Sequence, residues 1–302
     1  MKLNALPITF LLLPAIAACV VDDPDLASDQ LDITNAAETR VHEETVFLDF
    51  NPGSWCTGLA ITPHWVLTAA HCVDHFAQNV RIAGAVEVWS TNNSYDQVQI
   101  YGLGGNPSDA MIIRHPNFTP NSNDRQDDVA LIKLYGRGMT DGDTIDPFSA
   151  RIYWSSSEPW KSNYNGTDRD FHVAGYGFGG PAGDASTCDD EQDGQVKRLG
   201  RFELDPSISH FSSSYTAKAE TPYDQDICNG DSGAPYLLNR SGWYSFAIHS
   251  GSGPTPEEGG QEFGTLIRPK MSWIESTAAA RGPALSCANY LWSGTTYRQC
   301  SE

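Results

Sequence analysis

The residues of this chain best suited to chemistry lie in one short segment, 226–235, which reads Asp-Ile-Cys-Asn-Gly-Asp-Ser-Gly-Ala-Pro. A serine hydroxyl is a weak nucleophile at neutral pH, so it needs a general base and N–H donors aimed at the developing oxyanion. Ser232 is flanked by Gly230 and Gly233, and glycine tolerates backbone angles that point consecutive N–H groups into one cavity. Taken alone, the segment could also be a glycine-rich turn between two strands.

Two candidate partners for the serine lie earlier in the chain. His71 follows an apolar run over Leu59–Ala69, and Asp128 opens another apolar run over Val129–Leu134. An imidazole can take the serine proton, while a carboxylate orients the ring and stabilises its protonated form. A single histidine beside alanines is more often only a packed residue. The assignment of His71 therefore depends on the accompanying carboxylate and serine.

Three short blocks of this sequence resemble the signature blocks of the trypsin/chymotrypsin-like serine proteases, in that family's order. They are Thr-Ala-Ala-His-Cys at 68–72, Asp-Val-Ala-Leu at 128–131 and Gly-Asp-Ser-Gly at 230–233. The order His, Asp, Ser argues against an α/β-hydrolase, in which the nucleophile comes first and the histidine last. The resemblance runs, with gaps, from about Ile33 to Ala280. It implies an all-β fold of two antiparallel six-stranded β-barrels packed face to face, with the active site between them and a helix near the C-terminal end.

The resemblance also implies an exported serine endopeptidase. His71, Asp128 and Ser232 would form its catalytic triad, and the backbone N–H groups of Gly230 and Ser232 its oxyanion hole. The alternatives are a non-catalytic binding protein with the same fold, a protease with non-basic primary specificity, and a hydrolase of carboxylic esters. None of the three triad residues is substituted, which favours the enzyme.

The same resemblance predicts the substrate preference. The family places the floor of its primary pocket six residues before the nucleophile, which is Asp226 here. A confined carboxylate favours Arg or Lys before the cut bond, because it is costly to leave unpaired. Ser250 and Gly251 would begin the strand that pairs with substrate, and Gly264 would keep the pocket wall open. Ile227 departs from the small polar residue usual in trypsins, and an exposed loop acid remains the alternative for Asp226.

The composition excludes some partners. Thirty-eight acidic and 19 basic residues give a formal net charge of −19 over 302 residues, which speaks against nucleic acid and anionic membranes as partners. We expect polypeptide substrates, a monomer, and neither cofactor nor metal. The acidic loop 179–194 could bind calcium, but it matches no EF-hand pattern, so a solvated loop is the preferred interpretation.

The first residues predict export. Met1-Lys2 and the apolar stretch Ile8–Val21 are typical of a signal peptide, expected over 1–18, and too short to span a bilayer. The sequence before Cys19 resembles a bacterial lipobox, so Cys19 is a candidate for lipidation. Ordinary signal peptidase cleavage is the alternative. The mature protein is expected outside the cytoplasm, either secreted or as a cell-envelope lipoprotein.

Seven cysteines, less Cys19, leave six in an oxidising compartment. We favour sequence neighbours as partners: Cys56–Cys72, Cys188–Cys228 and Cys287–Cys300. The first matches the family's histidine-loop bridge. The second departs from the family, whose corresponding partner lies beyond the pocket strand, where this chain has no cysteine.

The expected organisation is an acidic tether or propeptide at 19–32, a protease domain at 33–282 and a disulfide-bearing tail at 283–302. The family is activated when cleavage frees an amino terminus that pairs with the acid before the serine, here Asp231. Ile33 is the preferred new terminus and Val41 the alternative.

Runs rich in Val, Ile and aromatic residues between Gly, Asn and Pro turns predict antiparallel strands. The expectations include one continuous strand over Leu59–Ala69, separate strands at Val80–Ala83 and Val86–Trp89, and a helix over Pro269–Ala280. The sequence predicts no role for the tail.

Overall fold

A computed structural model describes residues 37–39, 41–50, 54–91, 97–102, 107–120, 127–139, 150–154, 170–177, 196–204, 216–220, 227–240, 242–252, 262–292 and 295–302. No helix in these ranges is long and apolar enough to cross a membrane.

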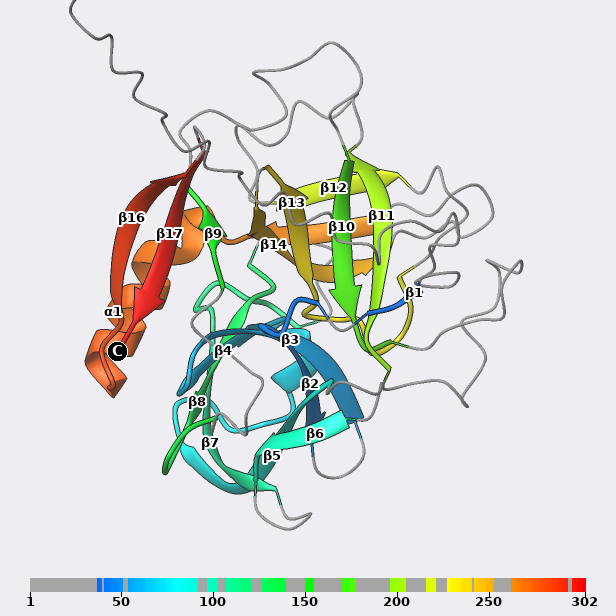
Figure 1. The fold of residues 1–302 in the computed structure, drawn as a ribbon. Coiled ribbons are helices and arrows are strands. Elements are labelled where there is room, and N and C mark those ends of the chain that lie inside the picture. The colour runs from blue at the N-terminus through cyan, green and yellow to red at the C-terminus, as the bar shows by residue number, and fades with distance from the viewer. Residues whose placement is uncertain are drawn as a thin grey trace, which may run out of the picture.

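The first half of the chain forms a closed antiparallel barrel of six strands (Figure 1). The ring runs β2 (Thr45–Phe50), β3 (Ser54–Thr62), β4 (Trp65–Thr68), β8 (Ala130–Leu134), β7 (Ser108–Arg114) and β5 (Arg81–Thr91), and closes where β5 pairs with β2. Strand β6 (Gln97–Tyr101) extends the sheet beside β5. Alternate strand residues point inward, so apolar side chains such as Val66, Val88 and Ile132 fill the barrel.

The second half repeats this architecture. Its ring consists of β10 (Asp170–Gly175), β11 (Arg198–Leu204), β12 (Thr216–Glu220), β15 (Glu262–Leu266), β14 (Trp243–Ser252) and β13 (Pro235–Asn239), which pairs again with β10. Strand β1 (Ala37–Glu38) adds to β11. Aromatic rings dominate the interior, with Phe171 packed against Phe202, Tyr236 and Phe246. The predicted all-β double barrel is confirmed.

A third apolar cluster lies where the barrels meet. It joins Leu67 and Leu131 of the first barrel to Ile248 of the second, and to Met271 and Ile274 of the helix. This helix, α1 (Met271–Arg281), follows a 3-10 turn over Arg268–Lys270. The expected helix start at Pro269 is therefore wrong by two residues, because the first turn is 3-10.

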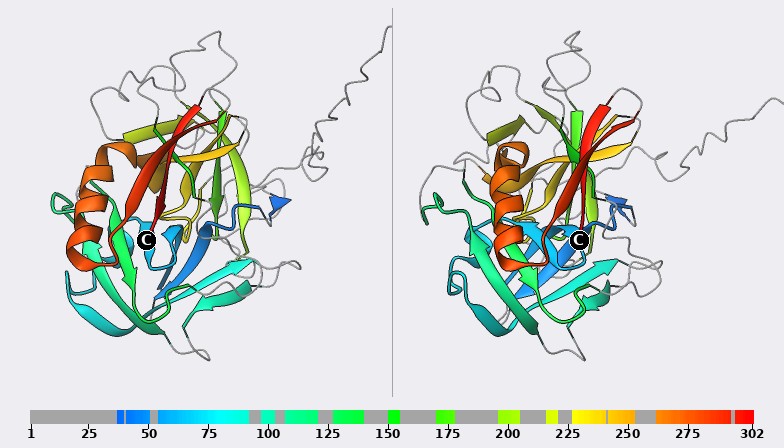
Figure 2. Two further views of the ribbon diagram at one scale, coloured as in Figure 1. Left: turned by 60° about the vertical axis from the view of Figure 1, so that its left-hand side comes forward. Right: turned by 90° about the vertical axis from the view of Figure 1, so that its left-hand side faces the viewer.

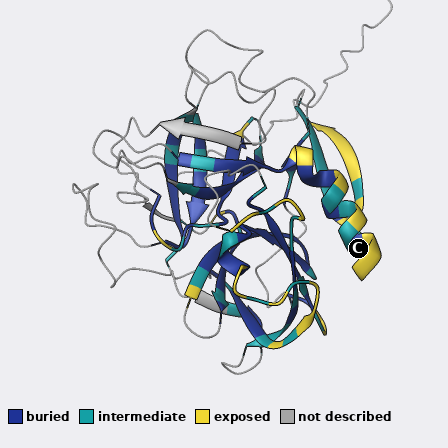
Figure 3. Ribbon diagram, turned by 180° about the vertical axis from the view of Figure 1, so that it is seen from behind, coloured by how far each residue is buried: buried dark blue, intermediate teal, exposed yellow. Residues whose placement is uncertain are grey.

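The last segment is a β-hairpin. Strands β16 (Ser286–Trp292) and β17 (Thr295–Ser301) pair along their whole length, and a disulfide joins Cys287 to Cys300. β17 pairs with β9 (Ile152–Tyr153), which in turn pairs with β14, so the hairpin extends the sheet of the second barrel (Figure 2). Figure 3 shows burial along the barrel strands and exposure on the outer strand β16.

Two strand predictions are wrong. The run Leu59–Ala69 is not continuous: the chain turns at Pro63 and His64, and β3 pairs back onto β4. Conversely, the two short strands expected on either side of Gly84 are one strand, β5. Gly84 has a φ of 60° and lies within a register shift against β7, so the glycine marks a bulge rather than a turn.

Candidate active site

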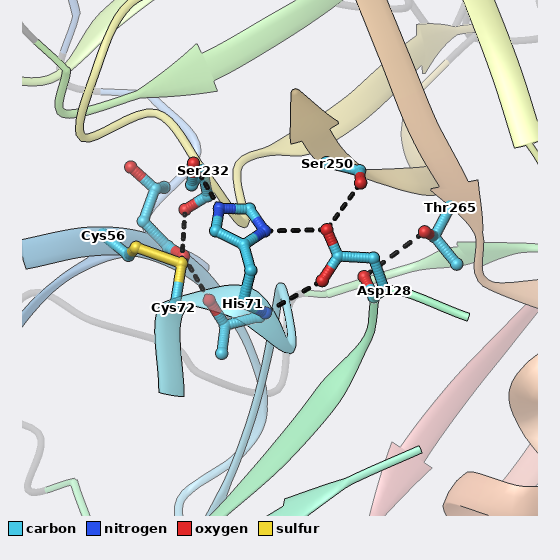
Figure 4. Close-up of polar contacts among 9 residues, drawn as sticks. Cys56, His71, Cys72, Asp128, Ser232, Ser250 and Thr265 are labelled. Atoms are coloured by element: carbon cyan, nitrogen blue, oxygen red, sulfur yellow. Dashed lines mark hydrogen bonds and ion pairs between the residues drawn. A yellow bond between two sulfur atoms is a disulfide. The ribbon is translucent and has the colours of Figure 1, made fainter. Parts of the chain in front are cut away.

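The three predicted triad residues come from both barrels (Figure 4). His71 opens a 3-10 turn three residues after the end of β4, and Asp128 lies two residues before β8. Ser232 lies in the turn that leads into β13. A disulfide between Cys56 and Cys72 ties the histidine turn to β3.

The imidazole of His71 lies between the carboxylate and the hydroxyl. Its Nδ1 is 2.7 Å from Oδ2 of Asp128, and its Nε2 is 2.8 Å from Oγ of Ser232. The backbone N–H of His71 also donates to Oδ1 of Asp128 at 2.9 Å. A carboxylate can only accept, so the neutral ring carries its proton on Nδ1 and leaves Nε2 free to accept the serine proton.

Asp128 is 1% exposed and is bound from the second barrel as well. Ser250 Oγ donates to its Oδ2 at 2.5 Å, and Thr265 Oγ1 donates to its backbone carbonyl at 3.2 Å. Burial alone would raise the pKa of Asp128, but the bonds from His71 and Ser250 hold that pKa below its ordinary value. The acid is therefore kept ionised, although it lies in the interior.

The turn around the serine requires glycine at two positions. Gly230 has a φ of 98° and Gly233 a φ of 88°. A Cβ on Gly230 would lie 2.3 Å from Nε1 of Trp55, and one on Gly233 would lie 2.1 Å from the carbonyl oxygen of Thr57. Within the described residues, neither the Gly230 N–H nor the Ser232 N–H has a hydrogen-bond acceptor. These two N–H groups are the donors that the sequence assigns to the oxyanion hole, and that assignment stays a prediction.

Asp231 is 1% exposed, and its carboxylate lies beside Gly175 at the end of β10. Its carboxylate accepts the N–H of Gly177 at 2.7 Å and the N–H of Cys228 at 3.0 Å. Burial raises the pKa of Asp231 to about 6, against the opposing effects of these bonds and of the charge on Arg198. Its proposed partner, Ile33, lies outside the described residues.

Comparison with known proteins now identifies the family. A family model described as Trypsin matches residues 33–274. The chain belongs to the trypsin family. The CLIP domain-containing serine protease HP8 of Bombyx mori is 31% identical over 242 residues, covering 74% of this chain and 62% of the relative. Protein masquerade of Drosophila melanogaster is 28% identical over 199 residues, covering 64% of this chain and 17% of the relative. Human granzyme M is 24% identical over 235 residues, covering 75% of this chain and 80% of the relative.

The chain thus spans less than two thirds of the first two of these relatives. Trypsin-family membership accounts for the order of the three signature blocks and for the double barrel. The disulfides Cys56–Cys72 and Cys287–Cys300 fit an oxidising compartment outside the cytoplasm.

The substrate-preference residues are only partly described. Asp226 lies outside the described residues, while Ile227 is buried at the start of the serine turn. A Cβ on Gly264 would lie 2.8 Å from the ring of Tyr236, so this position needs glycine, and its role in the pocket wall stays a prediction. Gly251 follows Ser250 at a register shift between β14 and β15.

A buried polar group behind the serine turn was not predicted. The hydroxyl of Tyr236 lies 3.0 Å from Nδ1 of His249, and the carboxylate of Glu262 lies 3.9 Å from the same nitrogen. His249 also accepts the N–H of Gly233 through its carbonyl at 2.9 Å, so the nucleophile turn rests on this strand. No sequence signal marked the group, because its members come from three strands.

The third predicted disulfide, Cys188–Cys228, is not tested by the described residues. Cys228 is disulfide-bonded, and Cys188, its predicted partner, lies outside the described residues, as does Cys19. Among the residues that the structure describes, no group of three or more His, Cys, Asp or Glu side chains could hold a metal ion.

Proposed function

We propose that this protein is an exported serine endopeptidase that cleaves after Arg or Lys by acyl transfer. The observation that carries the proposal is the position of the His71 ring, 2.7 Å from Asp128 on one side and 2.8 Å from Ser232 on the other. The protease domain would span 33–282. Trypsin-family membership and the relatives named as serine proteases support the reaction class.

In the first half of the reaction, Nε2 of His71 takes the proton of Ser232, and Oγ attacks the carbonyl carbon of the scissile bond. The N–H groups of Gly230 and Ser232 receive the negative oxygen. His71 then gives its proton to the leaving amine, and an acyl group stays on Oγ. In the second half, His71 takes a proton from water, the resulting hydroxide attacks the acyl carbon, and Ser232 regains its proton.

A fluorophosphonate probe tests the activated serine. The exported, processed protein should be labelled, and the Ser232→Ala variant should not. A correctly folded, processed chain that stays unlabelled and cuts no peptide would instead be a binding protein with the family's fold. Turnover of peptides compared with simple esters separates an endopeptidase from an ester hydrolase.

To explain cleavage after Arg or Lys, we propose that Asp226 forms the floor of the primary pocket and binds the cationic side chain of the substrate. Fluorogenic peptides that differ only in the residue before the cut should be cleaved after Arg and Lys and poorly after Leu. Asp226→Ala should abolish that difference. Equal cleavage after Leu and Arg by the parent enzyme would contradict the assignment.

For maturation, we propose that cleavage before Ile33 frees an amino group that pairs with Asp231, and that Cys19 carries a lipid. N-terminal sequencing of active protein distinguishes a start at Ile33 from one at Val41. Unchanged membrane association of a Cys19→Ser variant would reject lipidation.

A further inference from the structure

The two residues that supply the proposed oxyanion hole share one partner through their carbonyl groups. The hydroxyl of Thr57 donates to the carbonyl oxygen of Gly230 at 3.0 Å. The backbone N–H of Thr57 donates to the carbonyl oxygen of Ser232 at 2.9 Å. Thr57 lies on β3, so a residue of the first barrel fixes both ends of the serine turn of the second barrel.

The Thr57 hydroxyl is also an acceptor. The N–H of Tyr176 donates to Thr57 Oγ1 at 3.0 Å. The next residue, Gly177, donates its own N–H to the carboxylate of Asp231, which lies between Gly230 and Ser232 in the chain. The Thr57 hydroxyl therefore connects the Gly230 carbonyl to residues 176–177, and Gly177 in turn binds the carboxylate of Asp231.

Thr57 is itself held rigidly. It is 0% exposed, so water cannot take the place of its hydroxyl. Its carbonyl accepts the hydroxyl of Thr68 at 2.8 Å, and the preceding residue, Cys56, is bridged to Cys72. Trp55, two residues earlier, packs against Gly230, where it leaves no room for a Cβ.

We propose that Thr57 is a positioning residue for the oxyanion hole. Donors stabilise a developing oxyanion only if they already point at it, because reorientation during the reaction would cost most of the benefit. Gly230 has a positive φ of 98° and no side chain to restrict its backbone. The bond from the Thr57 hydroxyl to the Gly230 carbonyl fixes the peptide group that follows Gly230, and through the Gly230 backbone it limits the directions that the preceding Gly230 N–H can take relative to the Ser232 N–H. The inference rests on the proposed function.

The test compares Thr57→Val, which keeps the shape and removes the hydroxyl, with Thr57→Ser, which keeps the hydroxyl. For Thr57→Val we expect kcat to fall about 10- to 100-fold with KM within about threefold, since misplacing a catalytic group by an ångström can cost about 100-fold. The inhibition constant of a peptide aldehyde, whose adduct needs the oxyanion hole, should rise by a similar factor. Thr57→Ser should remain within about threefold of the parent in both measurements.

Thr62→Val is the matched control. Thr62 lies on the same strand, is also 0% exposed, and donates its hydroxyl to Glu302, far from the serine turn. It should lose stability but keep kcat. If Thr57→Val does not fold, Thr57→Ala against Thr57→Ser gives the same contrast, because these two variants differ only by the hydroxyl oxygen.

An unchanged kcat and aldehyde affinity in the variants without the hydroxyl would overturn the inference, as would a loss confined to KM or a serine variant as slow as the alanine variant. These outcomes leave the parent active and the proposed function intact. A processed parent that neither cleaves peptides nor reacts with the fluorophosphonate would refute the proposed function, and the inference with it.

Discussion

Asp128 stays ionised at a position where burial opposes its charge. The bond from Ser250 Oγ, at 2.5 Å, is one of the contacts that lower its pKa. We predict that Ser250→Ala raises the pKa of Asp128 and lowers kcat about 3- to 10-fold, because a hydrogen bond to a charged group contributes roughly 1.5–3 kcal/mol, only part of which reaches the transition state. Titration of the Asp128 carboxyl carbon by NMR and steady-state kinetics measure the two effects.

Ser245→Ala is the matched control for this change, because Ser245 is buried on the same strand but does not contact the triad in the described part of the chain. It should alter neither quantity. A Ser250→Ala variant with the parent's carboxyl titration would show that the two His71 contacts alone keep Asp128 ionised.

The pKa of Asp231 is shifted in the opposite direction from that of Asp128, because at Asp231 the effect of burial exceeds that of the hydrogen bonds. Its folded pKa, about 6, lies above the ordinary value of 3.8, so the folded chain binds this proton more tightly than the unfolded chain. Its contribution to stability is therefore present below pH 4 and is lost as the pH rises through 6. In the unprocessed Ser232→Ala chain, we predict that raising the pH from 4 to 7 costs the Asp231 form up to about 3 kcal/mol relative to Asp231→Asn.

Urea denaturation of both chains at pH 4 and pH 7 measures this difference, since the other titrating groups are common to both and cancel. A difference that does not change with pH would contradict the prediction. Processed enzyme provides the comparison: the amine proposed to pair with Asp231 should lower its pKa and remove the pH dependence.

At the scale of elements, strand β10 carries a second pH-dependent group. His172 lies edge-on to Trp243 at 5.0 Å, and burial, aided by the nearby His42 and Arg201, lowers its pKa to about 4. The His172 imidazole binds a proton near pH 6.5 in the unfolded chain but only near pH 4 in the folded chain. The free energy of unfolding therefore falls as the pH drops from 6.5 towards 4. His172→Phe keeps the ring contact and cannot titrate. We predict that it reduces the loss of stability between pH 7 and pH 5 by about 2 kcal/mol.

Denaturation midpoints of parent and variant at the two pH values test this prediction. Equal losses in both proteins would mean that the proton of His172 is not linked to folding.

The elements also show how far sequence reasoning reaches. The meeting of His71, Asp128 and Ser232 could be predicted because each lies in a short local block with its own pattern. The break at Pro63 and the bulge at Gly84 were misjudged because apolar content does not report strand register.

The contacts of Thr57 with Gly230 and of Ser250 with Asp128 were not predictable for another reason. Each joins residues more than a hundred positions apart, and neither threonine nor serine carries a local signal. Such contacts follow only from the way the two barrels close on each other.

At the scale of the whole molecule, the hairpin of β16 and β17 links the two barrels. It is continuous with the second barrel through β9, and Arg298 forms an ion pair with Glu275 of α1 at 2.5 Å. The indole N–H of Trp65, in the first barrel, donates to the carbonyl of Pro283 at 2.8 Å, just before the hairpin. Since the triad takes residues from both barrels, the added hairpin supports the interface on which the site depends.

Glu302 makes the last of these links. Its carboxylate accepts the N–H of His64 at 2.9 Å and the hydroxyl of Thr62, and it lies 2.5 Å from Nδ1 of His64. We predict that Glu302→Ala lowers the free energy of unfolding by about 1–2 kcal/mol, because the Thr62 hydroxyl and the His64 N–H both lose a charged acceptor. The variant should keep kcat at 25 °C, since no triad residue loses a contact.

Urea denaturation of Glu302→Ala, of Thr62→Val and of the double variant makes the test specific, with Ser301→Ala as the control for a neighbouring exposed residue. If Thr62 and Glu302 are bonded to each other, the double variant should lose less stability than the sum of the two single variants, because either single change already removes their shared hydrogen bond. Strictly additive losses, or a Glu302→Ala variant as stable as the parent, would mean that the hairpin ends beside the first barrel without holding it. The interface between the barrels would then be held by its other contacts, among them the apolar cluster and the bond from Trp65 to Pro283.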